Sequence, residues 1–61
     1  MKELDVVKLI EDFAGISAGT NGTIVLEYDG SHFEVELVDA AGDTIDVVTT
    51  PSELLALGEN F

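Results

Sequence analysis

The sequence predicts a small all-β domain, and three observations carry this prediction. An Asp29-Gly30 pair separates two runs in which apolar and polar residues alternate, and such a pair is a strong signal for a β-hairpin. A second turn, Asp39–Asp43, joins this hairpin to a third run, Thr44–Val48, which is rich in β-branched residues. A leading run of the same kind, Leu4–Ile10, supplies a further strand. The 61 residues amount to one domain, residues 1–61.

The first turn determines the register of the first hairpin. A type I′ turn with Asp29 and Gly30 at its centre makes Tyr28 and Ser31 opposite neighbours. The pairs that follow are Leu26 with Phe33, Ile24 with Val35 and Gly22 with Leu37 on one face, and Glu27 with His32, Val25 with Glu34 and Thr23 with Glu36 on the other. The first face is apolar and the second is mostly polar, and a slip of one residue would mix them.

The second turn extends the same core face to the third strand. Asp39–Asp43 suits a three-residue loop with Gly42 in the left-handed position. The pairs that follow are Leu37 with Ile45 and Val35 with Val47 on the core face, and Glu36 with Asp46 and Glu34 with Val48 on the outer face. We therefore expect seven residues to be buried together: Ile24, Leu26, Phe33, Val35, Leu37, Ile45 and Val47.

The remaining segments are expected to close the two ends of this sheet. Phe13 and Ile16 lie in a glycine-containing loop, where two bulky apolar residues fold back as a lid over the core. Residues 50–53 (Thr-Pro-Ser-Glu) match a capping box with proline at the first helical position, which predicts one helical turn. Residues 54–57 then continue either as helix, ending at Gly58, or as a short closing strand, and the strand is preferred because it covers a sheet edge. Residues 59–61 form a loose tail.

The charge balance limits the classes of partner. Thirteen acids face two lysines and no arginine, for a formal net charge of −11. Because phosphate contacts need Lys and Arg, we expect no nucleic-acid partner and no membrane partner. The chain has no cysteine, and its first residues lack the basic start and apolar run of a signal peptide. No apolar segment approaches the roughly 20 residues that span a bilayer, so a soluble cytoplasmic protein is expected.

Several short motifs together resemble a known family. They are Gly15-Ile16, then Gly19-x-x-Gly22-Thr23-Ile24-Val25, then the run from Phe33 to Asp39, and then Gly42-Asp43-Thr44-Ile45. Together these motifs are similar to a bacterial family of very small proteins, domain of unknown function 4926. The similarity extends from Leu4 to about Leu54. The family's usual proline after the first strand is absent, and Phe13-Ala14 stands there. The resemblance implies a small SH3-like five-stranded barrel, to which the capping pattern at 50–53 adds one short helical turn near the C-terminus, and it brings no catalytic residues.

Candidate catalytic and metal-binding groups are few. The lone His32 is expected to pair with Glu27 across the strands, and Ser31 beside it points to the opposite face. The Glu36 and Asp46 carboxylates lack a cleft, and with Glu34 they fall short of the 6–8 oxygen ligands that Ca²⁺ takes. The glycines at 19 and 22 precede a strand and no lysine follows, unlike a phosphate loop. We therefore expect no enzyme activity, no cofactor and no bound metal.

The outer face of the predicted sheet is the candidate functional surface. Val25 and Val48 lie on the wrong parity for the core, beside Glu34, and the predicted Glu36–Asp46 pair opposes two like charges. These five residues are either ordinary surface or a protein contact, and the small size of the chain favours a contact.

We expect an acidic protein-interaction module that forms a homo-oligomer, binds a basic protein, or both. The family resemblance adds the expectation that it serves as an accessory or immunity-type partner of another protein. Two alternatives are a nucleic-acid mimic that blocks a DNA-binding protein, and a KOW-like RNA- or ribosome-associated module, which the charge disfavours.

Overall fold

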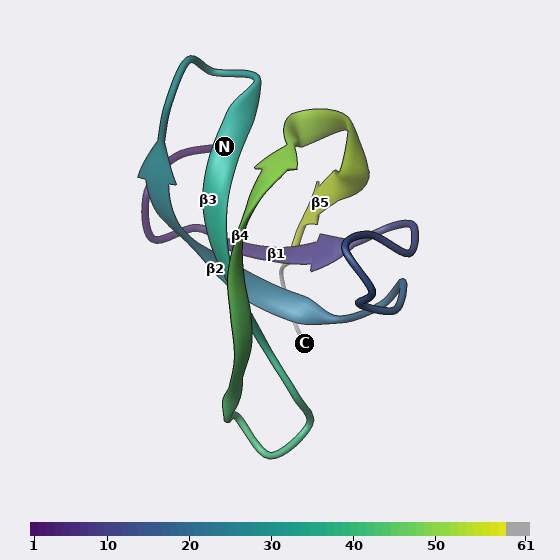
Figure 1. Ribbon diagram of the computed structural model, residues 1–61. Coiled ribbons are helices and arrows are strands. Elements are labelled where there is room, and N and C mark those ends of the chain that lie inside the picture. The colour runs from purple at the N-terminus through teal and green to yellow at the C-terminus, as the bar shows by residue number, and fades with distance from the viewer. Residues whose placement is uncertain (59–61) are drawn as a thin grey trace.

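The computed structural model describes residues 1–58, and over these residues the chain forms five strands and one 3-10 turn. The elements are β1 (Val6–Leu9), β2 (Asn21–Glu27), β3 (His32–Val38), β4 (Thr44–Pro51), the 3-10 turn η1 (Ser52–Leu54) and β5 (Leu55–Leu57). The strands pair antiparallel in the order β4-β3-β2-β1-β5 (Figure 1). The predicted all-β fold, with five strands and a short helical turn near the C-terminus, is confirmed. The predicted tail at 59–61 lies outside the described residues.

The core takes alternate residues from the strands. Its buried apolar members are Val7, Leu9, Ile16, Ile24, Phe33, Val35, Leu37 and Leu55. Four of the seven residues predicted to be buried together are among them. The prediction of burial is wrong for the other three, because Leu26 is 43% exposed, Ile45 48% and Val47 43%. All three errors follow from β-bulges, which shift the register of a strand by one residue and so reverse its faces.

The first hairpin differs from the prediction at its tip and agrees at its base. The backbone N–H of Tyr28 donates to the carbonyl of His32 at 3.1 Å, so the turn contains three residues and not two. Leu26 consequently stands opposite Glu34. Val25 is the extra residue of a bulge, and beyond it Ile24 pairs with Val35 as predicted. The longer turn and the bulge cancel each other at the base, while Leu26 is left on the outer face.

The second hairpin agrees with the prediction at its tip and differs along β4. The N–H of Asp39 donates to the carbonyl of Asp43 at 2.9 Å, and Gly42 has a φ of +89°, which confirms the three-residue loop. The register then shifts between Val38 and Leu37, because Ile45 is an extra residue in β4. No second shift cancels this one along the described ladder. The residues of β4 that pair with β3 are therefore shifted by one from the predicted pairs. Val35 stands opposite Val48, Glu36 opposite Val47, and Leu37 opposite Asp46.

Two predictions for the ends of the sheet meet different outcomes. Phe13 and Ile16 exchange two backbone hydrogen bonds of 2.8 Å, and both side chains pack on the core, as expected for a lid. The predicted capping box is wrong, because Thr50 is a fully buried residue of β4 whose hydroxyl donates to the carbonyl of Val48 at 3.2 Å. The helical turn begins after Pro51 and has no side-chain cap.

The β4 register can be tested with two neighbouring valines. Val48→Glu should lower the free energy of unfolding by about 1–2 kcal/mol, because the half-buried Val48 side chain packs against the core and a carboxylate there is desolvated. Val47→Glu should change it by less than about 0.5 kcal/mol, since Val47 is exposed. Urea unfolding followed by circular dichroism measures both variants, which carry the same added charge. The reverse ranking would show that β4 has the register without a bulge.

Candidate functional site

The face of the β2-β3-β4 sheet that points away from the core is where acids and exposed apolar side chains meet. We call it the outer face and define it by two rows of paired residues. One row is Leu26, Glu34 and Thr49, and the other is Thr23, Glu36 and Val47. In each row a carboxylate of the central strand β3 lies between an apolar residue on one side and a threonine on the other.

Hydroxyl groups hold both carboxylates of the outer face in position. One carboxylate oxygen of Glu34, Oε1, accepts hydrogen bonds from the Thr49 hydroxyl at 2.7 Å and from the Tyr28 hydroxyl at 3.3 Å. The Glu36 carboxylate accepts a hydrogen bond from the Thr44 hydroxyl. Both glutamates are half-buried. Neutral donors orient these carboxylates but leave their negative charges in place, so each remains able to attract a cationic group.

The five residues predicted for the contact surface are not all brought together. Glu34 and Glu36 lie on the outer face, and Val25 is 42% exposed at the bulge beside Leu26. The placement of the other two is corrected: Val48 packs against the core, and Asp46 stands opposite Leu37 instead of Glu36. The predicted like-charge pair of Glu36 and Asp46 is therefore not formed across the strands.

Leu26 and Val47 are the apolar residues of the outer face that the sequence pattern missed. Both were assigned to the core, and each moves outward because of a one-residue bulge, at Val25 in β2 and at Ile45 in β4. Glycine often marks a bulge, but neither of these positions is glycine. The sequence therefore carries no local signal for the shift.

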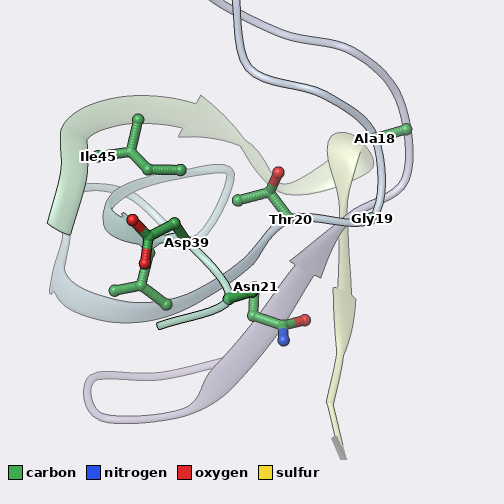
Figure 2. Close-up of a pocket in the computed structure, with 8 residues that line it drawn as sticks. Ala18, Gly19, Thr20, Asn21, Asp39 and Ile45 are labelled. Atoms are coloured by element: carbon green, nitrogen blue, oxygen red, sulfur yellow. The ribbon is translucent and has the colours of Figure 1, made fainter. Parts of the chain in front are cut away.

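A shallow hollow of about 420 Å³ lies beside the outer face, between the loop that precedes β2 and the β3–β4 hairpin (Figure 2). It is lined by Ala18, Gly19, Thr20, Asn21, Val38, Asp39, Ala40 and Ile45. The Asp39 carboxylate accepts hydrogen bonds from the backbone N–H groups of Ala41 and Asp43 at 2.9 and 3.0 Å, so it stabilises the β3–β4 turn. The amide oxygen of Asn21 is buried without a partner among the described residues, and in Figure 2 this amide points away from Asp39 and Ile45.

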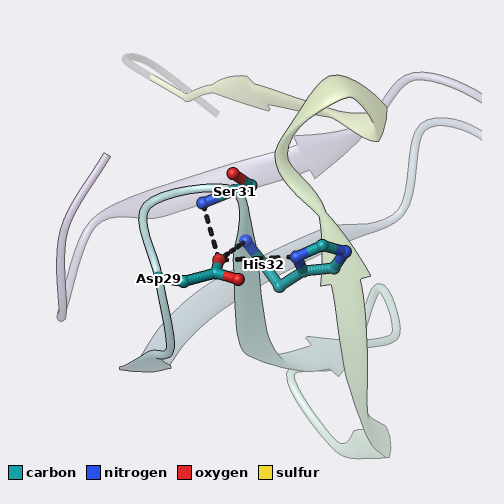
Figure 3. A network of polar contacts seen from close by, with 3 residues as sticks. All are labelled: Asp29, Ser31 and His32. Carbon is teal, nitrogen blue, oxygen red and sulfur yellow. Dashed lines mark hydrogen bonds and ion pairs between the residues drawn. The ribbon is translucent and has the colours of Figure 1, made fainter.

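A small polar network orders the tip of the β2–β3 turn (Figure 3). The Asp29 carboxylate accepts the backbone N–H groups of Ser31 and His32 at 2.9 Å each, and these bonds lower the pKa of Asp29 below its ordinary value. The ring Nδ1 of His32 lies 3.4 Å from the same carboxylate oxygen. The prediction that His32 pairs with Glu27 is wrong, because Glu27 stands opposite Phe33 in the lengthened hairpin.

Residues 1–58 contain neither a metal-binding cluster nor a membrane-spanning helix. These residues contain no group of three or more His, Asp or Glu side chains placed to hold a metal ion. The same part of the chain has no helix with the length and apolar character needed to cross a membrane.

Comparison with known proteins identifies a family and no individual relative. No curated protein and no solved structure matches the chain. A family model matches residues 3–57, which include all five strands and the 3-10 turn. The chain therefore belongs to the family described as Domain of unknown function (DUF4926).

Proposed function

We propose that this domain is a protein-interaction module whose outer face binds a basic protein. The observation that carries the proposal is the pattern of the outer face, in which Glu34 and Glu36 occupy the central strand and exposed apolar side chains flank them. Apolar area supplies the affinity of a protein interface, and charged groups supply specificity and association rate. Leu26 and Val47 would supply the apolar area, and the carboxylates of Glu34 and Glu36 would supply the charged groups.

The overall charge supports a basic partner over a second copy of the chain. Each copy carries a formal charge of −11, so two copies repel each other over the Debye length of about 8 Å at physiological ionic strength. An isologous contact through the outer face would also bring Glu34 and Glu36 of one copy near those of the other. A partner with lysine or arginine gains from the same charges.

Self-association is the second candidate function, and one observation favours it. The two bulges place Leu26 and Val47 outside the core, each more than two-fifths exposed, so the outer face is more apolar than the predicted pairing implied. High salt would screen the repulsion between copies and strengthen self-association, whereas it would weaken binding to a basic protein. Sedimentation across a salt series separates the two functions.

A matched pair of double variants tests the role of the outer face. Immobilised wild-type protein captures partners from the native host, and mass spectrometry identifies them. Affinity for the purified partner is then measured. Glu34→Gln combined with Glu36→Gln should weaken binding about tenfold or more, since two charge pairs are lost. The glutamine at 34 keeps an oxygen that can accept the Thr49 and Tyr28 hydroxyl groups, so the fold is retained.

The control removes the same charge elsewhere. Glu3→Gln combined with Glu11→Gln changes two exposed acids that lie outside every strand, and it should leave binding within about twofold of wild type. Equal weakening by both double variants would mean that only net charge matters, and the proposed role of the outer face would then be wrong.

A further inference from the structure

Strand β4 forms one edge of the sheet and pairs only with β3 among the described residues. It is the longest strand, with eight residues, and all but Asp46 and Pro51 are β-branched. An edge strand presents a row of unpaired N–H and C=O groups to which another chain can add. The opposite edge, β5, has only three residues, and such short edges offer little to pair with. The β4 edge is therefore the one that can accept another strand.

The backbone groups of β4 that face the open edge can be identified. Backbone groups alternate in direction along an antiparallel strand. The N–H of Val47 donates to the carboxylate of its neighbour Asp46 at 2.8 Å, so this N–H is directed away from β3. The backbone N–H of Thr49, two residues further along β4, is also directed away from β3, because backbone groups alternate in direction. The bulge at Ile45 limits this open stretch at one end, and Pro51, which has no N–H, limits it at the other.

We propose that an extended segment of the basic partner adds to this edge as a further strand, with lysine or arginine at alternate positions facing the outer face. The proposal rests on the proposed function and specifies how the partner is recognised. Alternate side chains of a strand lie about 6.8 Å apart on one face, and Glu34 and Glu36 have this same spacing on β3. Two basic residues at alternate positions of the added strand would therefore match the two carboxylates.

The apolar side chain of Val47, on β4 between β3 and the added strand, fits this arrangement. The added strand would lie about 9.6 Å from β3, which is two strand spacings, with β4 between them. A lysine or arginine would cross β4 with its apolar stem on the exposed Val47 side chain and bring its charged group toward Glu36. Asp46 lies at the edge itself, and its carboxylate would release the Val47 N–H to the incoming strand.

Two synthetic peptides of equal composition test the spacing. One alternates threonine and lysine over seven residues with three lysines, and the other places its three lysines in a block. Proton–nitrogen NMR with the intact protein measures both affinities and the exchange of the Val47 and Thr49 amides. The alternating peptide should bind about tenfold more tightly and should slow exchange of the Thr49 amide. Equal affinity for both peptides, with unchanged exchange, would overturn the proposal.

Backbone methylation of the peptide tests the strand pairing without altering the protein. N-methylation of one alternate set of peptide residues should abolish binding, since that set donates to β4, and methylation of the other set should leave it unchanged. Equal effects of the two sets would overturn the edge pairing. If Glu34→Gln with Glu36→Gln still weakened capture of the partner, the proposed function would stand without the edge.

A second copy of the chain is the competing occupant of the edge. A dimer of the peptide-free protein in which the Thr49 amide is protected from exchange would assign the β4 edge to self-pairing and overturn the proposal. Monomeric protein whose Thr49 amide gains protection only with the alternating peptide would support it.

Discussion

Replacing Phe33 by alanine is expected to lower the free energy of unfolding by about 3–5 kcal/mol. Phe33 is 1% exposed and is the bulkiest of the fully buried side chains. Its removal loses the burial of an aromatic ring and leaves a cavity that the neighbouring strands cannot close. At roughly 0.1 kcal/mol per residue, a chain of 61 residues has about 6 kcal/mol of stability. The variant should therefore keep only about 1–3 kcal/mol of stability, and it should unfold at a much lower urea concentration and temperature than wild type.

Urea unfolding followed by far-ultraviolet circular dichroism measures this loss. Tyr28→Ala is the matched control, because Tyr28 is an aromatic residue of the same hairpin that is 54% exposed. It should cost about 1 kcal/mol or less, mainly through the lost hydroxyl contact with Glu34. A Phe33→Ala protein with the urea midpoint of wild type would contradict the core as described.

Gly22→Ala should lower the free energy of unfolding by about 2–3 kcal/mol, because no space exists for the added methyl group. A Cβ at Gly22 would lie 2.8 Å from the backbone carbonyl oxygen of Glu36, 2.8 Å from a methyl group of Val35 and 2.9 Å from one of Leu37. The Glu36 oxygen belongs to the strand paired with Gly22, so it cannot move aside without breaking the β2–β3 ladder.

Gly19→Ala separates crowding from backbone conformation. Gly19 has a φ of +90°, and a Cβ there meets nothing within 4 Å, so its replacement costs about 1 kcal/mol from the left-handed backbone alone. Gly22 has the opposite character, with crowding and no positive φ. Thermal unfolding of both variants should show the larger loss at Gly22. A larger loss at Gly19 would mean that β2 and β3 are less closely packed than described.

The candidate site was only partly predictable from the sequence. Glu34 and Glu36 lie on the outer face because β3 runs without a bulge between Phe33 and Leu37, and strict alternation locates them. Leu26 and Val47 entered the outer face through bulges in the neighbouring strands, and Val48 left it for the same reason. The sequence could therefore name the acids of the surface but not their apolar neighbours.

The sequence by itself determined the number of strands, the places of the two hairpin turns but not the length of the first one, and the core face of β3, where apolar and polar residues alternate strictly. Only the tertiary structure decided which face of β4 is buried. Ile45 and Val47 lie on one parity of this strand and Val48 and Thr50 on the other, so either face could cover the core with β-branched side chains. When burial differs so little between two registers, local composition cannot choose between them. In the structure the extra residue at Ile45 makes the choice, because it reverses the faces of β4 and turns Val48 and Thr50 toward the core.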